Sequence, residues 1–466
     1  MQHALNDKKI TRAWTMYDWA NSVFSLTIAT AIFPPYYESV SKSASIAQQG
    51  VDKEPYLLNF LGFKVVNTAL YSYTLSLGFL LVAIITPILS GIADAKQNKK
   101  FFMKMFCYLG AASCIIMYFF TAQTIYFGLT LFVISLVGFT SSIVYYNAFL
   151  PEIATEDNYD KLSAKGYSLG YVGSVLLLLF NLSLIMFPSL VFPLQNKALQ
   201  MQQTGLTETD ALQAAKSYYE SIAIRLSFVS VGLWWAGFAQ ITFRHLPEKP
   251  VTTNNHESIF YKGFLQLKKV WLELQLPQNS IIKRYLWGFF FTSMGLQTVM
   301  YVASLFGSYE LKLPTQDLII LIIIIQIVAI AGAHFFSWLS KKNGNIYTLI
   351  VMLSIWIIIC VLAFMVQNKV QFFGIGILVG LVMGGIQSLL RSTYAKIIPD
   401  GTKNNASYFS FYDVSEKLAI VFGTFVFGFL LDYTGSMRLS TLAIAAFFST
   451  GMFFIARIKN FKELHP

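Results

Sequence analysis

The chain has 466 residues, of which 55% are hydrophobic and only 12% are charged, and its formal net charge is +11. This composition excludes an ordinary soluble globular protein, in which about 25% of residues are charged, and it indicates a protein with many membrane spans. The excess of Lys and Arg would suit nucleic-acid binding only if these residues gathered on one soluble segment.

Twelve runs of about twenty apolar residues follow one another along the chain, each long enough to cross a bilayer as a helix. The polar segment 1–12 leads directly into the first run without a short apolar core and a cleavage site, so no signal peptide is expected. The predicted spans are 14–36, 71–93, 101–120, 125–150, 167–190, 222–243, 285–306, 318–339, 346–366, 372–398, 408–431 and 439–458.

The basic residues are distributed unevenly between the connections. Of the 34 Lys and Arg, 23 lie in or beside the N-terminus, the even-numbered loops and the C-terminus, and eight lie in odd-numbered loops. Three lie within spans: Arg225, Arg391 and Lys417. By the positive-inside rule, both termini and the even loops face the cytoplasm, and the inner membrane of a bacterium is the expected location. The positive charge therefore indicates membrane topology, and no nucleic-acid partner is expected.

The longest cytoplasmic connection, 244–284, separates six predicted spans from six. It contains the amphipathic sequence SIFYKGFLQLKKVWLEL, from Ser258 to Leu274, which we expect to form a helix on the membrane surface. Pro151 and Pro399 follow the fourth and tenth spans and suggest an internal repeat around a central pathway. We predict an N-terminal six-helix half at 1–243, a cytoplasmic linker at 244–284 and a C-terminal six-helix half at 285–466.

Five polar motifs stand out in and beside the spans. They are YDWANS in the first span, NAFLPEIA after the fourth, GYSLGYVGS opening the fifth, GGIQSLLRSTYAKIIP in the tenth and FYDVSEK in the eleventh. With these motifs the chain resembles the major facilitator superfamily, and within it the autophagy-related vacuolar amino-acid effluxer family and its bacterial relatives. The resemblance implies an all-α membrane protein with twelve transmembrane helices in two pseudo-symmetric six-helix halves.

The same resemblance implies a secondary active transporter that moves a small solute by alternating access. An amino acid or a similar zwitterion is the leading solute, and coupling to protons is left open. The sequence SGIADAKQNKK resembles a degraded superfamily loop motif in which Asp94 is kept, whereas Ala95 and Gln97 replace its first arginine and its glycine. Asp94 is expected to hold neighbouring helix ends. Met294 stands where the family tends to carry an acid, so no proton or substrate role is carried over to it.

Six charged residues lie within or at the edges of the spans. A charge at mid-bilayer costs about 2.5–3.5 kcal/mol on insertion scales, so each should be paired, hydrated or functional. We expect Asp18 to face Arg391 or Lys417 of the other half as a gate, or to carry a coupling proton; helix capping with interfacial solvation is the alternative. The six residues are Asp18, Asp413, Glu416, Arg225, Arg391 and Lys417.

Structural and functional interpretations both stay open for several of these charges. Asp413 and Lys417 are four residues apart on one helix face, so they form either a structural pair or part of a cavity wall. Arg225 is expected to reach the membrane interface by snorkelling. The predicted gate or coupling set is Asp18, Asp94, Arg391, Asp413, Glu416 and Lys417.

Amides and hydroxyls in the first, fourth, seventh and tenth spans form the predicted substrate pathway. Together with one acid and two bases, they suit a zwitterion or a neutral polar solute better than a polyanion, which would require more arginine. Gly384 and Gly385 precede Gln387, so helix packing alone is an alternative role there. The pathway residues are Asn21, Ser22, Asn147, Gln297, Thr298 and Gln387.

No pattern for catalysis, a cofactor or a metal is readable. The three cysteines lie in apolar segments without Cys/His spacing, and no Ser-His-Asp or paired-histidine arrangement is present. We therefore expect no cofactor, and as partners only a small solute and membrane lipids around a monomer. A membrane-embedded enzyme and a non-transporting receptor are the alternative functions.

Overall fold

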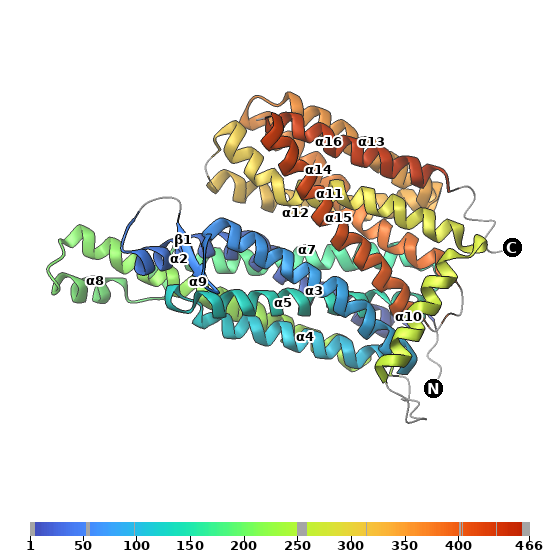
Figure 1. The fold of residues 1–466 in the computed structure, drawn as a ribbon, viewed down its shortest axis with the longest axis horizontal. Coiled ribbons are helices and arrows are strands. Elements are labelled where there is room, and N and C mark those ends of the chain that lie inside the picture. The colour runs from blue at the N-terminus through green and yellow to red at the C-terminus, as the bar shows by residue number, and fades with distance from the viewer. Residues whose placement is uncertain are drawn as a thin grey trace.

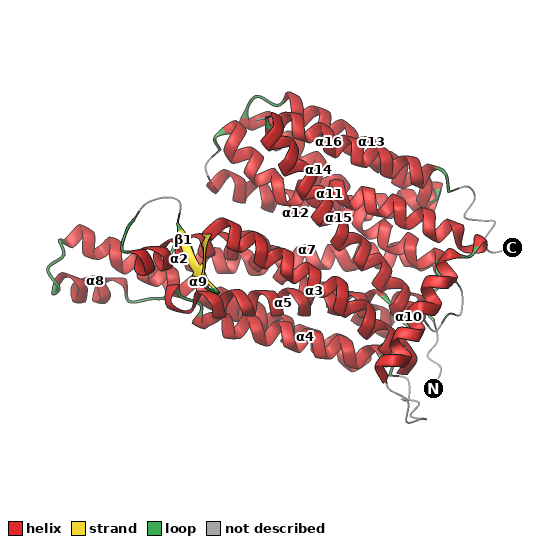
Figure 2. Cartoon of the chain, in the orientation of Figure 1, coloured by secondary structure: helices red, strands yellow, loops and turns green. Residues whose placement is uncertain are grey.

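The computed structural model is almost entirely helical, with one short β-hairpin (Figure 2). It describes residues 5–52, 56–96, 98–248, 259–313, 315–399, 402, 404–434 and 436–458. Two groups of long helices meet towards the end of the molecule at which both chain ends lie, and they diverge towards the other end (Figure 1). We call the first end the terminus side and the second the far side.

The first group of helices is formed by residues 8–245. Its α-helices are α1 (Lys8–Val23), α2 (Phe33–Gln49), α3 (Asn67–Lys96), α4 (Lys99–Ile116), α5 (Ile125–Asn147), α6 (Leu150–Ile153), α7 (Glu156–Met186), α8 (Leu194–Gln202) and α9 (Glu208–His245). A π-helix, η1 (Phe24–Ile32), continues α1, and 3-10 helices occur at η2 (Met117–Phe119), η3 (Ala122–Thr124) and η4 (Pro188–Leu190).

On the far side, β1 (Leu57–Phe60) pairs antiparallel with β2 (Phe63–Val66). The two turn residues, Leu61 and Gly62, have φ values of 51° and 88°. Positive φ at both positions matches the right-handed twist of a two-residue hairpin.

The second group begins after the linker helix α10 (Ile259–Gln275). It contains η5 (Pro277–Asn279), α11 (Ser280–Leu311), α12 (Thr315–Asn343), α13 (Asn345–Met365), α14 (Lys369–Ile397), α15 (Asn405–Thr434) and α16 (Met437–Ala456). Helix α10 packs against α3 and α15. A helix thus lies at the predicted position, whose first residue, Ser258, lies outside the described residues; its place on the membrane surface remains a prediction.

Each predicted span falls on helical structure, and the all-α architecture is confirmed. Within the described ranges, nine helices are long and apolar enough to cross a membrane; twelve crossings remain a prediction. Helices α7 and α9 begin at Glu156 and Glu208, well before the predicted starts at 167 and 222. The difference arises because apolar length measures only the part of a helix that lies in lipid.

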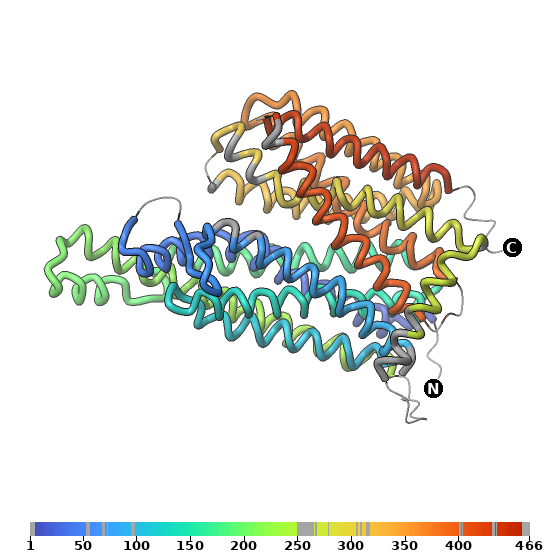
Figure 3. The backbone as a smooth tube through the Cα atoms, in the orientation of Figure 1, coloured from blue at the N-terminus to red at the C-terminus, as the bar shows by residue number. Residues whose placement is uncertain are grey.

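The packing of the helices is repeated in the two groups, whose paths are traced in Figure 3. Helix α1 packs on α7 and α9, and α4 on α5 and α9, just as α11 packs on α15 and α16, and α13 on α14 and α16. Contacts between the groups follow the same order, because α3 and α5 meet α15 while α12 and α14 meet α7. The two groups are thus pseudo-symmetric halves; the exact residue bounds of the halves and of the linker remain a prediction.

Helices α12 and α14 approach each other closely along a row of glycines. A Cβ on Gly384 would lie 2.3 Å from the Ala329 carbonyl oxygen, and one on Gly332 would lie 1.9 Å from that of Leu381. Only glycine permits this distance between the two backbones. We call this close contact the α12–α14 seam. It confirms the expected close packing at Gly384 and fixes the position of Gln387 and Arg391 farther along α14.

Candidate functional site

A cavity of about 290 Å³ lies between the two halves. Its wall includes polar side chains of α1, α5, α11 and α14, namely Asn21, Ser22, Asn147, Gln297 and Gln387. From the level of Arg391 the cavity extends towards the far side as far as Thr30, which is exposed. The structure thus brings five of the six predicted pathway residues together around one space.

Thr298, the sixth predicted pathway residue, has a different position. Its side chain is fully buried, and a Cβ on Gly423 of α15 would lie 2.4 Å from its Oγ1. Because neighbouring residues of a helix point about 100° apart, Gln297 faces the cavity while Thr298 faces α15. Met294, one turn earlier, also packs against α15, with its carbonyl oxygen 2.7 Å from the same Cβ position.

The π-helix η1 forms the far-side part of the cavity wall, through Ser25, Ala29 and Thr30 among others. Thr30 Oγ1 donates to the Ser25 carbonyl five residues earlier, at 2.8 Å. π-helical turns are rare and frequently occur at functional sites. The run FSLTIATAI carries no hydropathy signal that separates a π-helix from an α-helix, so sequence reasoning missed it.

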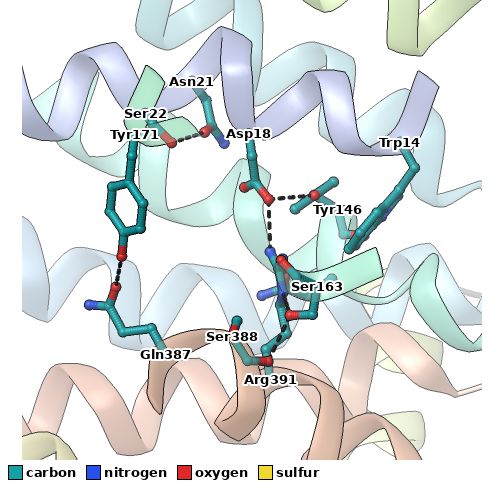
Figure 4. A network of polar contacts seen from close by, with 11 residues as sticks. Trp14, Asp18, Asn21, Ser22, Tyr146, Ser163, Tyr171, Gln387, Ser388 and Arg391 are labelled. Carbon is teal, nitrogen blue, oxygen red and sulfur yellow. Dashed lines mark hydrogen bonds and ion pairs between the residues drawn. The ribbon is translucent and has the colours of Figure 1, made fainter. Parts of the chain in front are cut away.

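Asp18 and Arg391 join the halves at the terminus-side end of the cavity (Figure 4). Arg391 Nη1 lies 3.2 Å from Asp18 Oδ2, and Tyr146 donates its hydroxyl to the same oxygen at 2.7 Å. Trp14, one turn before Asp18, donates to the Tyr146 carbonyl at 2.9 Å. Of the two partners expected for Asp18, the structure selects Arg391.

The guanidinium of Arg391 is enclosed on all sides. Its Nε and Nη2 donate to the hydroxyl and the carbonyl of Ser163, each at 2.9 Å, and Nη1 is 3.5 Å from Asn147 Oδ1. Three aromatic rings lie within 5.4 Å of its central carbon: Trp14, Tyr146 and Tyr167. Hydrogen bonds together with ring faces compensate a buried guanidinium for its lost hydration.

A second cluster of charged side chains lies on α15, in the wall of the same cavity. Lys417 Nζ is 3.3 Å from Asp413 Oδ1 and 2.7 Å from Glu416 Oε2. Gln297 of α11 donates to Glu416 Oε1 at 2.9 Å. Asp413 and Lys417 therefore form an intrahelical pair and also line the cavity, so the two interpretations left open by the sequence hold together.

Asp94 connects the halves on the terminus side. Its carboxylate accepts from the backbone N–H groups of Ala406 at 3.2 Å and Ser407 at 2.6 Å, in the first turn of α15. Lys99, which also pairs with Glu152, lies 3.6 Å from Asp94. The expectation that Asp94 holds a helix end is confirmed as a contact. The altered loop position Gln97 lies outside the described residues.

Asp160 of α7 forms a further contact between the halves, which sequence reasoning missed. It accepts from Ser340 at 2.8 Å, Asn345 at 3.0 Å and Lys396 at 2.8 Å, all from the other half. Because Asp160 precedes the apolar run that begins at 167, it was assigned to a loop. The sequence around Asp160 gives no signal that its partners lie about 180 or more residues away along the chain.

Arg225 of α9 lies apart from this site. Its Nε donates to the Ser221 carbonyl at 3.3 Å, and its guanidinium lies 5.2 Å from the Tyr118 ring centroid. Large apolar side chains elsewhere on the outer helical surface are exposed, for example Leu233, Ile327 and Phe425, as expected where lipid covers the surface.

The sequence matches a protein-family model over nearly its full length. The model, described as "Vacuole effluxer Atg22 like", matches residues 6–463. The "uncharacterized MFS-type transporter YxiO" of Bacillus subtilis is 26% identical over 448 residues, covering 96% of this chain and 94% of YxiO. Autophagy-related protein 22-1 of Aspergillus terreus is 23% identical over 499 residues, covering 89% and 76% of the two chains.

Solved structures of transporters share the fold. The E. coli fucose:proton symporter FucP has a TM-score of 0.66 at 14% identity, covering 96% of this chain and 97% of FucP. The human organic anion transporter MFSD10 has a TM-score of 0.67 at 12% identity, covering 97% and 100%. The proton:xylose symporter XylE has a TM-score of 0.65 at 13% identity, covering 97% and 95%. At these identities the likeness concerns the fold alone.

Proposed function

Because the chain belongs to the vacuole effluxer Atg22-like family of the major facilitator superfamily, we propose that its central cavity binds and releases a small zwitterionic solute, with an amino acid as the leading candidate. The coarser function follows from the family: the chain is a multi-pass membrane protein and a secondary transporter of small solutes, not an enzyme. Efflux is the direction that the family description suggests.

The observation that carries this proposal is the cavity between the halves, which ends at Asp18 and Arg391 on one side and reaches the exposed Thr30 on the other. Its volume of about 290 Å³ is at the lower limit for drug-sized ligands, about 300–1,000 Å³, and suits a small solute. Alternating access then requires the contacts on the terminus side to break while the far side closes.

The test is solute binding and flux by the purified full-length protein. A thermal-shift screen over amino acids, peptides and sugars should reveal at least one amino acid that raises the melting temperature. The same solute should exchange across liposomes in a counterflow assay, whereas liposomes without protein should show no exchange. Absence of both a thermal shift and flux for every solute would favour a non-transporting receptor.

We include proton coupling in the proposal. Its support is the set of three carboxylates in the cavity, Asp18, Asp413 and Glu416, and the description of FucP and XylE as proton symporters. A pH-sensitive dye inside the liposomes should respond when the solute is added. Solute flux without any dye response, and without any effect of a pH gradient, would exclude coupling to protons.

We also propose that the terminus side faces the cytoplasm, as the partition of basic residues predicts. The native Cys107, Cys114 and Cys360 are buried, so they give a low background for thiol labelling. In intact cells, a cysteine replacing Asn98 should be protected from an impermeant thiol reagent, and one replacing Gln202 should react. The opposite pattern would reverse the topology. Asn255, a third useful position, lies outside the described residues.

Asp94→Asn should shift the protein towards conformations open on the terminus side, because only one oxygen remains to accept from the first turn of α15. Turnover should fall more than solute affinity, since Asp94 lies outside the cavity wall. Counterflow rate and Kd measure the two effects separately. Glu248→Gln is a control, because Glu248, just after α9, pairs with Lys100 and Lys104 of α4 in the N-terminal half. Full turnover in Asp94→Asn would show that this contact does not control the conformation.

A further inference from the structure

The charged residues of the cavity wall do not balance. Five of the described residues in this wall are charged. Three are carboxylates and two are cations, so the wall carries one negative charge in excess. They are Asp18, Asp413, Glu416, Arg391 and Lys417.

Neither cation is available to an anionic solute. The Arg391 side chain is only 3% exposed, and Asp18, Ser163 and ring faces occupy its donors and its surfaces. Lys417 is 9% exposed and contacts two carboxylates, those of Asp413 and Glu416. A solute carboxylate would have to break one of these buried ion pairs, which is unfavourable in a region of low dielectric.

The two carboxylates on α15 differ in accessibility. The side chain of Glu416 is 28% exposed, the highest value among the five charged residues of the wall. Asp413 is buried, and among the described residues its Oδ2 has no hydrogen-bond partner. A buried oxygen without a donor is costly, and a donor supplied by the solute would remove that cost. Because Asp413 and Glu416 are three residues apart, they lie on one helix face.

Amide donors lie elsewhere in the same wall. Asn21 Nδ2 is buried without a hydrogen-bond partner in the described part of the chain. Gln387 Nε2 has a weak sulfur acceptor, Met300 Sδ, at 3.8 Å. These neutral N–H groups suit a carbonyl or a carboxamide on the solute. The wall therefore has an acidic side on α15 and an amide side on α1 and α14.

We propose that the cavity recognises a protonated amine, whose N–H groups bind the carboxylates of Asp413 and Glu416. An ammonium has three donors, enough for Asp413 Oδ2 and for Glu416. A solute with net positive charge neutralises the wall completely, so it binds more tightly than a zwitterion of the same shape, and a solute without an amine is excluded. The inference rests on the proposed function, because it assigns a solute class to the same cavity.

The test compares three probes that share one side chain: leucinamide, leucine and N-acetyl-leucine, at a pH where the amine is protonated. Binding to the full-length protein in nanodiscs is measured by titration calorimetry. Leucinamide should bind about tenfold more tightly than leucine, a difference of about 1.4 kcal/mol, and N-acetyl-leucine should not bind. If another amino acid gives the largest thermal shift, its amide and N-acetyl forms replace these probes. Equal affinity of the amide and N-acetyl forms would overturn the proposal.

Glu416→Gln keeps the shape of the side chain and removes its charge, so it should weaken leucinamide binding by about tenfold or more. Glu416→Asp should restore part of the affinity. Glu220→Gln is the matched control, because Glu220 pairs with Lys216 on α9 away from the cavity. Melting temperature and elution profile establish that each variant is folded. Unchanged affinity in a folded Glu416→Gln variant would overturn the proposal.

The outcomes also separate this inference from the proposed function. Binding and flux of a sugar or another solute without an amine, with no effect of Glu416→Gln, would overturn the amine site and leave a working transporter. Absence of binding and flux for all solutes would instead overturn the proposed function.

Discussion

Asp18→Ala should abolish transport and lower the melting temperature of the protein. The substitution leaves Arg391 buried, at 2% exposure, without its acidic partner. Removing one member of a buried pair typically costs about 3–5 kcal/mol. Counterflow in liposomes and thermal unfolding measure the two losses. Wild-type flux in a folded variant would show that the ion pair is not needed for the transport cycle.

A double-mutant cycle separates the pair from its surroundings. The losses caused by Asp18→Asn and by Arg391→Gln should together exceed the loss in the double variant, because the double variant contains no unpaired buried charge. The Asp317–Lys369 pair, at 2.7 Å with Lys369 half exposed, is the matched control and should show a coupling of only about 0–1 kcal/mol. Additive losses at Asp18 and Arg391 would contradict a gate formed by this pair.

Exchanging the two charges should recover little activity. In Asp18→Lys combined with Arg391→Asp, the new carboxylate would face the Ser163 carbonyl and the Tyr167 ring, and both favour a cation.

A role of Asp18 as the carrier of the coupling proton predicts a different result from a role as a gate. If Asp18 carries this proton, Asp18→Asn should uncouple transport from a pH gradient and leave counterflow intact. The pH dependence of flux in Asp18→Asn therefore distinguishes the gate from the proton carrier.

Asp160→Ala should shift the protein by about tenfold or more towards conformations open on the terminus side. Lys396, which is 10% exposed, loses its ion-pair partner in the closed arrangement, whereas opening allows water to reach it. Spin labels replacing the exposed Lys161 and Lys341, one on each half, should report longer distances by electron paramagnetic resonance.

Asp157→Ala is the control for this shift. Asp157 is an acid on the same helix, and its side chain contacts Thr155 and Asn158 beside it. It should leave the distance distribution unchanged. An unchanged distribution in Asp160→Ala as well would show that Asp160 does not stabilise the closed terminus side.

Much of the candidate site could be predicted from the sequence, because polar residues within apolar spans are visible without a structure. Asn21, Ser22, Asn147, Gln297 and Gln387 were found because polar groups in lipid-spanning helices require a partner or a function. Thr298 was placed with them because adjacent polar residues look equivalent in sequence, but the direction of a side chain depends on which helix packs beside it. The π-helix η1 and the contacts of Asp160 depend on non-local packing in the same way.

By itself, the sequence determined the helical class, the positions of the long apolar helices and their order in two similar sets, because apolar length and polar interruption are properties of each segment alone. Only the tertiary structure decided that Asp18 pairs with Arg391 while Lys417 stays with Asp413 and Glu416. That choice depends on helix rotation and on the close α12–α14 seam at Gly332 and Gly384, which together bring residues 373 positions apart into contact. The excess negative charge of the cavity wall has the same origin, because only the packing of the helices places three carboxylates and two bases around one space.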